Sequence, residues 1–296
     1  MIHLEHVSKS FASIKAVDDV SMAINKAAIT ILTGADGSGK STIFKMLVGL
    51  VKKDSGTIFL RGEDIGGDYS KITSICGYMP ERFSLYTDLS VEENMNFFAD
   101  IQQVPRRRRE ELKQRLLEKT GMLPFKKRRV GALSGGMKQK LSLSAILLSS
   151  PELIILDEPT TGVDPLSRIE FFTIIEDLKK EGKTIVMSTP YLDEAEKGDF
   201  AVLLKNGRIM VQDSIAMLKK SFPARLFSIL PRGNIFEVMQ QINAVPGLGS
   251  QVHMRGKFIR YMQSGPENLV QQIPHLEITE EKPTLEDVYI YHERRQ

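Results

Sequence analysis

One glycine-rich segment carries the residue types that phosphate chemistry needs. It matches the pattern G-x-x-x-x-G-K-[ST] in full and consists of Gly34, Ala35, Asp36, Gly37, Ser38, Gly39, Lys40, Ser41 and Thr42. Glycines let the backbone turn several N–H groups toward one anion, and the N-terminus of the following helix adds partial positive charge. We expect Lys40 to bind the β- and γ-phosphates of a nucleotide, Ser41 to ligate Mg²⁺ and Thr42 to contact the α-phosphate.

Two adjacent acidic residues follow an apolar run farther along the chain. Leu153–Leu156 predicts a buried strand, and Asp157 and Glu158 stand at its carboxyl end. Unpaired buried charge is costly, so these carboxylates need a partner. A metal ion near bound phosphate would supply one.

A serine followed by two glycines opens a further helical pattern. Ser134 is a natural N-cap for a helix that continues through Ser149. Gly135 and Gly136 would let a ligand approach the backbone closely.

Strands and helices alternate around these segments. The run Ala28–Leu32 predicts the strand that leads into the glycine loop, and the pattern from Lys40 to about Leu50 predicts the helix that leads out of it. Alternation over Ile2–Ile24 predicts half-buried strands, and Arg61–Asp64 predicts a turn. Further strands are expected at Gly56–Leu60, Ser74–Met79, Thr184–Ser188 and Ala201–Leu204, and further helices at residues 165–180 and 192–196.

Residues 91–130 combine helical spacing of apolar residues with dense charge. Four consecutive arginines occupy Arg106–Arg109, and a second basic run occupies Lys126–Arg129. Such runs are typical of a solvated helical face. They also fit a surface that faces an acidic loop of a partner protein or anionic lipid headgroups.

Beyond about Lys220 the sequence has no further phosphate-binding motif. Strands are expected at Ala224–Leu230, Val252–Met254 and Phe258–Met262, and helices at Ile235–Ile242 and Glu267–Ile273. This pattern predicts a small α+β appendage over residues 221–296.

Composition narrows the class of protein. The chain has 296 residues, 42% of them hydrophobic, with a net charge of +3 that by itself does not indicate nucleic-acid binding. Cys76 is the one cysteine, which excludes a disulfide framework and a cysteine metal cluster and fits a reducing cytoplasm. No apolar run reaches the roughly 18 residues of a membrane helix, and the N-terminus does not have the pattern of a signal peptide. We therefore expect any membrane role to be exerted from the inner face through a partner.

Several motifs in this order resemble those of the ATP-binding-cassette (ABC) ATPases, the nucleotide-binding subunits of membrane transporters. Besides the glycine loop, they are the signature-like Leu133–Met137, the Walker B-like Leu153–Glu158 and the D-loop-like Gly162–Asp164. The resemblance implies an α/β P-loop ATPase fold with a mixed central sheet, an antiparallel β subdomain and a helical signature subdomain at about residues 88–150. It covers about residues 1–220.

The resemblance also implies roles for single residues. Asp157 would support Mg²⁺, and Glu158 would polarise the attacking water. In this family two subunits close face to face over two ATP molecules, so signature residues contact the γ-phosphate bound to the opposite subunit. The residues expected in that contact and in the D-loop are Ser134, Gly135, Gly136 and Asp164.

Phe11 has two interpretations. Spacing alone favours a core aromatic residue, whereas its position matches the aromatic residue on which adenine stacks in this family.

Three positions depart from the family pattern. Asp36 stands where asparagine is usual, and Glu81 stands where a glutamine normally links Mg²⁺ and water to the transmembrane partner. A glutamate can still ligate Mg²⁺, so Glu81 is kept as a metal-binding and catalytic candidate. Pro190 replaces the switch histidine and has no side-chain donor or acceptor. ATP binding is expected to persist while hydrolysis is slow.

Local similarities extend to multidrug and antibiotic exporters of the ABC-2 type, through segments such as Gly77–Glu81, Tyr191–Glu196 and Pro283–Tyr289. We expect a Mg·ATP-dependent ATPase that powers an exporter with a transmembrane permease and a second nucleotide-binding domain, at the cytoplasmic face of the membrane. The main alternative is a largely non-hydrolysing ATP-binding module paired with an active domain. A soluble ATPase acting on ribosomes or DNA would want a second cassette or long insertions, which the sequence does not have, so no nucleic-acid partner is expected.

Overall fold

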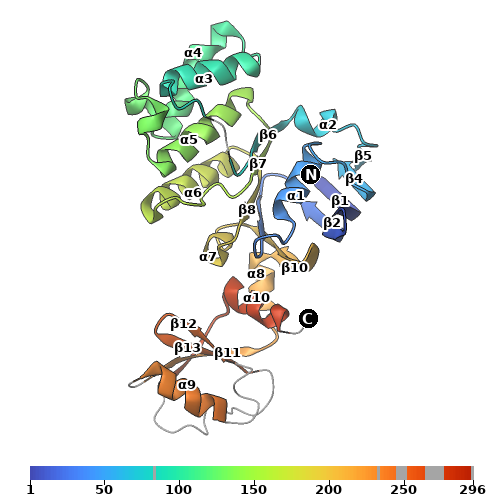
Figure 1. Cartoon of the computed structure of the whole chain (residues 1–296), viewed down its shortest axis with the longest axis vertical. Coiled ribbons are helices and arrows are strands. Elements are labelled where there is room, and N and C mark those ends of the chain that lie inside the picture. The colour runs from blue at the N-terminus through green and yellow to red at the C-terminus, as the bar shows by residue number, and fades with distance from the viewer. Residues whose placement is uncertain (83–84, 232–233, 245–251, 264–276, 295–296) are drawn as a thin grey trace. The chain divides into compact units, whose positions relative to one another are not determined.

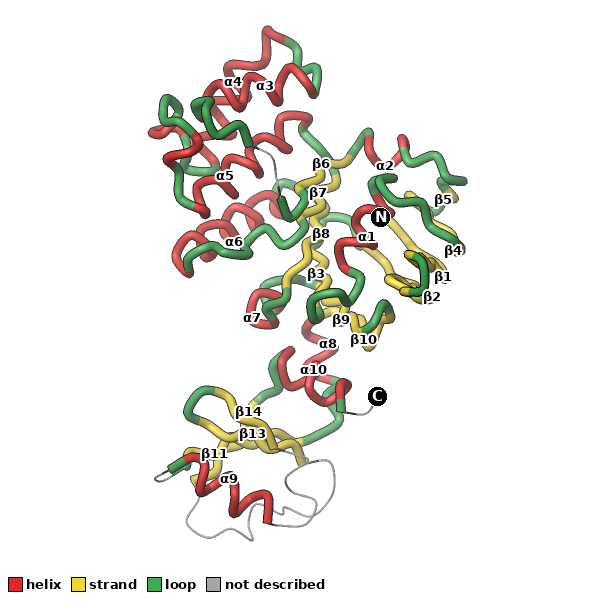
Figure 2. Tube along the Cα trace, in the orientation of Figure 1, coloured by secondary structure: helices red, strands yellow, loops and turns green. Residues whose placement is uncertain are grey.

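Strand β3 leads into the glycine loop and lies inside a six-stranded sheet of order β10-β9-β3-β8-β7-β6 (Figure 2). The computed structural model describes residues 1–82, 85–231, 234–244, 252–263 and 277–294. Neighbouring strands of this sheet are parallel except for β10, which pairs antiparallel with β9. The strands are β3 (Ile29–Thr33), β6 (Cys76–Met79), β7 (Leu153–Leu156), β8 (Thr184–Thr189), β9 (Phe200–Lys205) and β10 (Arg208–Ser214).

The central strands are buried along their whole length and are mostly apolar. Every residue of β3, β7 and β8 is buried, as expected where both faces of a parallel sheet are covered. Helix α1 (Lys40–Leu47) lies on one side of this sheet, and α5 (Gly135–Ile146) and α6 (Pro165–Lys180) lie on the other (Figure 1). The mixed central sheet expected from the sequence is confirmed.

A second, antiparallel sheet of order β2-β1-β4-β5 packs with α1 into one hydrophobic core. Its strands are β1 (Ile2–Phe11), β2 (Ile14–Ile24), β4 (Ser55–Leu60) and β5 (Glu63–Asp64). The expected turn is therefore wrong in its second half, because Glu63 and Asp64 pair with Leu60 and Phe59. Arg61 and Gly62, both with positive φ, make the turn alone.

The helical part contains α3 (Val91–Ile101), α4 (Arg106–Lys119) and α5. Ser90 starts α3 with a capping box, in which its hydroxyl accepts from the Glu93 N–H while the Glu93 carboxylate accepts from the Ser90 N–H. Lys126–Arg129 is not on a helical face as expected, since these four exposed residues lie in the connection between two short 3₁₀ helices, η1 (Leu123–Phe125) and η2 (Val130–Ala132). Short elements complete this unit: α2 (Ser70–Thr73), η3 (Leu147–Ser149) and α7 (Leu192–Ala195).

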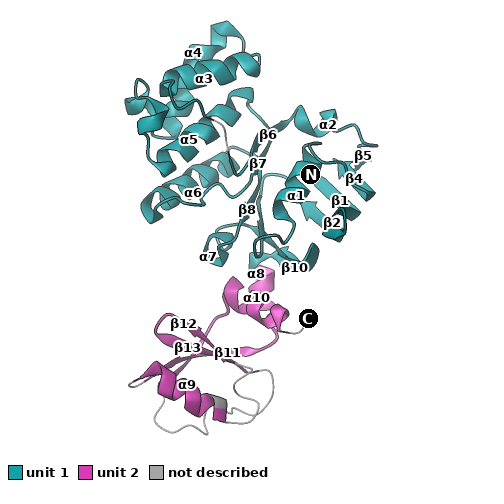
Figure 3. Ribbon diagram, viewed as in Figure 1, with its two compact units in different colours: residues 1–215 teal, residues 216–296 magenta. Residues whose placement is uncertain are grey.

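The chain forms two compact units, residues 1–215 and residues 216–296 (Figure 3). The sequence placed this boundary at residue 220, which is the last residue of helix α8 (Ile215–Lys220). No helix in the described ranges is both long and apolar enough to cross a bilayer.

Residues 216–296 contain an antiparallel sheet of order β12-β13-β11-β14 with helices α9 and α10. Its elements are β11 (Arg225–Leu230), α9 (Ile235–Ala244), β12 (Val252–Arg255), β13 (Phe258–Gln263), β14 (Glu277–Glu281) and α10 (Leu285–Glu293). Residues of α9 pack with β11, β12 and β13 in a separate hydrophobic core. The helix expected at Glu267–Ile273 lies outside the described residues.

Candidate nucleotide site

The glycine loop between β3 and α1 has a backbone that only glycine adopts easily at three positions. Gly34, Gly37 and Gly39 have φ of 153°, 77° and 105°. A Cβ at Gly34 would overlap the Leu204 carbonyl oxygen, and one at Gly39 would overlap the Ala16 carbonyl oxygen. The loop therefore requires Gly34 and Gly39 for both conformation and space, and Gly37 for conformation alone.

Lys40 closes the loop from inside. Its side chain is only 4% exposed, and Nζ donates to the carbonyl oxygens of Gly34 (2.8 Å) and Ala35 (3.2 Å). Helix α1 begins at this residue without a side-chain cap, so its first N–H groups are available to an anion. The buried Ser38 hydroxyl also lacks a hydrogen-bond partner among the described residues. Loop and helix together present donors and positive charge at one point.

Asp157 is a buried carboxylate that joins three elements. It is 2% exposed, and its Oδ1 accepts from the hydroxyls of Ser41 on α1 (2.9 Å) and Ser188 on β8 (2.7 Å). The Glu158 N–H donates to the same Ser188 hydroxyl at 2.9 Å. Burial raises the pKa of Asp157, opposed by the two serine bonds and reinforced by the charge of Glu158. The two serine hydrogen bonds thus stabilise the charged form of Asp157, whereas burial destabilises it.

Glu158 directs its carboxylate toward the glycine loop from an unusual backbone conformation. Its φ is 48°, in the left-handed region that non-glycine residues seldom adopt. Oε1 lies 3.5 Å from Lys40 Nζ, and Oε2 accepts from the Thr161 hydroxyl at 3.2 Å. The side chain is 14% exposed, so it is held in place but still reachable.

A cavity of about 460 Å³ connects the residues expected to handle phosphate. The structure brings Glu81 and Glu158, which are far apart in the sequence, to the same cavity as the loop. The lining residues are Ala16, Asp36, Gly37, Ser38, Gly39, Lys40, Ser41, Thr42, Glu81, Glu158 and Thr161.

Phe11 lies at the end of β1, where its ring is 47% exposed and Lys9 Nζ is 5.4 Å from the ring centre. The interpretation of Phe11 as a core aromatic residue is therefore wrong. An exposed ring remains available for stacking.

The signature and D-loop residues do not line this cavity. Ser134 caps α5 by accepting from the Met137 N–H (3.3 Å), and Asp164 caps α6 by accepting from the Ser167 N–H (2.9 Å). Gly136 has a packing role that the sequence did not reveal, because a Cβ there would overlap the Ser167 side chain. Within the chain, these residues position helices rather than contact the phosphate loop.

A second buried carboxylate, Glu194, holds the segment around Pro190. Its Oε2 accepts from the hydroxyls of Thr160 (2.8 Å) and Thr189 (2.6 Å), and Arg168 Nε lies 3.1 Å from Oε1. The turn at Pro190 is therefore tied to the loop after β7 and to α6. Sequence analysis missed this cluster, because its members become neighbours only through the fold.

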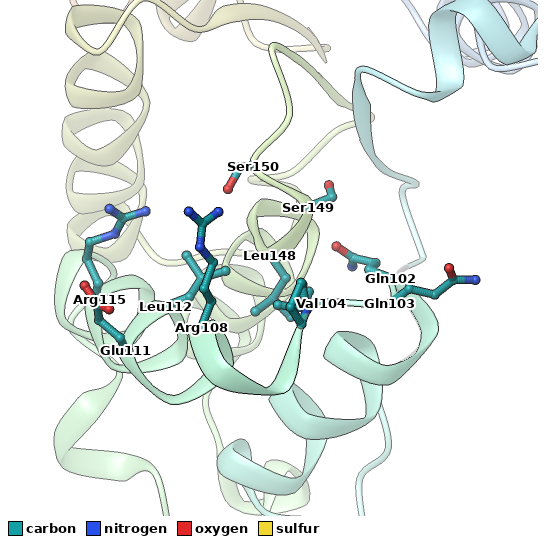
Figure 4. Close-up of a pocket in the computed structure, with 11 residues that line it drawn as sticks. Gln102, Gln103, Val104, Arg108, Glu111, Leu112, Arg115, Leu148, Ser149 and Ser150 are labelled. Atoms are coloured by element: carbon teal, nitrogen blue, oxygen red, sulfur yellow. The ribbon is translucent and has the colours of Figure 1, made fainter.

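Another cavity, of about 610 Å³, lies elsewhere, at the start of α4 (Figure 4). The guanidinium groups of Arg108 and Arg115 point to the side on which Ser150 lies, and among the described residues neither has a partner. Glu111 is the one carboxylate in the lining. The other lining residues are Gln102, Gln103, Val104, Pro105, Leu112, Leu148 and Ser149.

Comparison with known proteins gives concordant matches. Residues 17–161 match the ABC transporter family. The chain is 36% identical over 298 residues to the probable multidrug ABC transporter ATP-binding protein YbhF of Escherichia coli K12, covering 98% of this chain and 51% of that protein. It is 31% identical to the Nod factor export ATP-binding protein I of Rhizobium sp. strain N33, covering 98% and 95%. The chain thus spans about half of the first relative and nearly all of the second.

Solved structures agree with these sequence matches. The structure of cbiO1 from Clostridium perfringens, part of the ABC transporter complex cbiONQ, superposes with a TM-score of 0.67 at 26% identity, over 84% of this chain and 96% of that one. An ATP-binding subunit of an ABC transporter gives a TM-score of 0.66 at 27% identity, over 75% and 93%.

Asp157→Asn should stabilise the free protein by roughly 1 kcal/mol at neutral pH, because it removes a buried charge but keeps an oxygen for both serine bonds. Burial raises the folded-state pKa, so the cost of the charge grows as pH rises from the unfolded-state value to the folded-state value. The gain should therefore shrink as pH is lowered. Urea unfolding without nucleotide or metal measures it, with exposed Asp193→Asn as the matched control. Equal or lower stability of Asp157→Asn at neutral pH would contradict this account.

Proposed function

Since this chain belongs to the family of ABC transporter ATP-binding proteins, we propose that it hydrolyses ATP to power a membrane exporter. The observation that carries the proposal is the shared cavity of Lys40 and Glu158, where a phosphate-binding cation and a water-polarising carboxylate lie side by side. The name of one relative, the Nod factor export ATP-binding protein I, supports export as the direction.

Mg²⁺ fits the oxygen donors beside the phosphate loop. Ser41 and Asp157 already meet through a hydrogen bond, and the Glu81 carboxylate lines the same cavity. Among the described residues no group of three or more acidic, histidine or cysteine side chains forms a metal site. This suits Mg²⁺, which is usually held by one or two protein oxygens together with substrate phosphates and water. When bound, it would neutralise charge on the phosphates.

Residues of the chain would bind the nucleotide and orient the attacking water. The loop N–H groups and Lys40 would bind the β- and γ-phosphates, Thr42 would contact the α-phosphate, and Glu158 would orient the attacking water. Phe11 would stack on adenine with its exposed ring.

A second nucleotide-binding domain would complete the site. Ser134 and Asp164 stand at the N-terminal ends of α5 and α6, outside the cavity that their own chain forms. Helix N-termini attract anions, so the start of α5, with Gly135 and Gly136, suits the γ-phosphate bound by an opposing chain. ATP would then hold two domains together.

The large cavity at α4 suits an acidic cytoplasmic loop of the permease. Arg106–Arg109 occupies the first turn of α4, which contains no acidic residue, although cations at a helix N-terminus are unfavourable. Arg109 is paired with Asp100, whereas Arg108 and Arg115 face the cavity and have no partner in the described part of the chain. A carboxylate-bearing partner would remove this mismatch. We therefore favour a protein partner over lipid headgroups and place the chain at the cytoplasmic face of the membrane.

Pro190 favours a second candidate function, that of an ATP-binding module with little turnover of its own. The ring supplies no hydrogen bond where the family has a histidine, and the Tyr191 N–H is directed to the Thr189 hydroxyl at 3.1 Å. In that case a partner domain would carry most of the hydrolysis.

Lys40→Ala should weaken Mg·ATP binding about 10- to 100-fold, because it removes charge-assisted bonds to the phosphates. Glu158→Gln should keep the affinity and lose most of the turnover. Equilibrium dialysis with Mg·ATP and phosphate-release assays measure the two effects. Exposed Lys45→Ala on the same helix serves as the control. Unchanged affinity of Lys40→Ala would disprove the assignment of the site.

Pro190→His should raise kcat and leave KM nearly unchanged, since it restores a donor near the γ-phosphate. A missing transition-state donor typically costs on the order of 10²–10³ in rate. Steady-state assays should show this gain for histidine and none for Pro190→Ala. If the wild type hydrolyses ATP fast and Pro190→His gives no gain, the second candidate function is excluded and the exporter ATPase is supported.

Arg108→Glu combined with Arg115→Glu should reduce binding to membrane vesicles that contain the permease about tenfold or more, by placing like charges against the acidic loop. Arg106→Glu with Arg107→Glu, outside the cavity lining, should have a smaller effect. Co-sedimentation measures both. Equal wild-type binding to protein-free vesicles of anionic lipid would instead favour the headgroup interpretation.

A further inference from the structure

We infer that Thr161 is a positioning residue, which orients the Glu158 carboxylate so that it can direct the water that attacks the γ-phosphate. This inference rests on the proposed function. The Thr161 hydroxyl donates to Glu158 Oε2 at 3.2 Å, and both side chains line the phosphate cavity. Thr161 was not among the candidates that the sequence supplied.

A tight turn in the backbone brings Thr161 close to Glu158. The Thr161 N–H donates to the Glu158 carbonyl oxygen at 3.2 Å, which closes a four-residue turn with Pro159 in its second position. Proline is favoured there because its φ is already set for the turn. One backbone bond and one side-chain bond therefore join the same two residues.

The neighbouring hydroxyl groups are committed to other acceptors. Thr160 and Thr189 donate to Glu194, and Ser188 donates to Asp157. Among the described side chains, the hydrogen-bond and ion-pair partners of the Glu158 carboxylate are Thr161 and Lys40. Among the described residues, Thr161 supplies the hydroxyl that bonds this carboxylate.

Nucleotide binding would change the balance between these two contacts. Lys40 lies 3.5 Å from Oε1 in the free chain but would be drawn to the phosphates, leaving Thr161 on Oε2. The final torsion of a glutamate side chain is broad, so a single directed bond is effective in fixing the plane of the carboxylate. With Oε2 held, Oε1 is free to accept from the attacking water in one orientation.

Because Pro190 replaces the switch histidine, we expect the Thr161–Glu158 hydrogen bond to contribute more to catalysis in this chain. Pro190 contributes no side-chain bond near the reacting phosphate, so orientation of the water depends on Glu158 and on what holds it. Thr161 is exposed in the single chain, so its replacement should not disturb the core.

The test compares Thr161→Val, Thr161→Ser and wild type in Mg·ATP hydrolysis and binding. Valine keeps the shape but removes the hydroxyl, and we expect kcat to fall about tenfold with KM and the ATP dissociation constant unchanged. Serine should restore most of the wild-type kcat. Thr173→Val, an exposed threonine on α6, is the matched control and should behave as wild type.

A double-mutant cycle separates orientation of Glu158 from a general structural effect. In a Glu158→Gln background, Thr161→Val should cause little further loss. Wild-type kcat in Thr161→Val, an equal loss in the Glu158→Gln background, or a parallel loss of ATP affinity would each overturn the inference. If wild type and Glu158→Gln turn over ATP equally, the proposed function fails and the inference fails with it. If only Glu158→Gln is impaired, the inference alone is wrong.

Discussion

A buried carboxylate accepting two hydroxyl bonds is the interaction on which the phosphate site depends. Asp157 connects Ser41 on the helix after the glycine loop with Ser188 at the end of a neighbouring strand. Its own N–H donates to the Met79 carbonyl oxygen (2.8 Å), close to Glu81 in the chain. Because β6, β7 and β8 are parallel, their carboxyl ends lie at one edge of the sheet, where α/β proteins usually bind ligands. The sheet thereby places four functional segments within reach of one another.

Several features of this edge are unfavourable for folding when considered alone. Asp157 carries a charge in a buried position, Glu158 has a left-handed backbone, and the glycine loop is entropically costly to order. The fully buried, mostly apolar strands β3, β7 and β8 provide the stability that holds these features in place. Departures from local preference concentrate where chemistry is expected, as is common in enzymes.

What the sequence could predict depended on the range of the interactions involved. The glycine loop and the Asp157–Glu158 pair were predictable, since each motif is contiguous and its chemistry is local. The Glu194 cluster was not, because the burial of Glu194 and its bonds to Thr160 and Thr189 arise from strand pairing and helix packing. The Thr161 contact is local, but no motif pointed to it, since the turn after Glu158 sets the direction of the Thr161 hydroxyl.

Other errors came from polar segments with weak periodicity. Strand β14 reads EITEE, which gives little apolar alternation, and its place in a sheet comes from pairing with β11. Helix α10 begins with a capping box of Thr284 and Asp287. This local signal could have predicted the helix, but the segment was interpreted only through its similarity to exporter sequences. Lys126–Arg129 shows that a dense basic run carries no information about helix or loop.

The close contact of Gly136 with Ser167 links the two helices whose first turns carry the signature and D-loop residues. A side chain at position 136 would overlap Ser167, so the close approach of the two helices depends on this glycine. Ser134 and Asp164, which cap these helices, are therefore held at a fixed spacing. We therefore expect the starts of α5 and α6 to unfold locally as one cooperative unit. Their amide hydrogens should exchange with solvent together rather than independently.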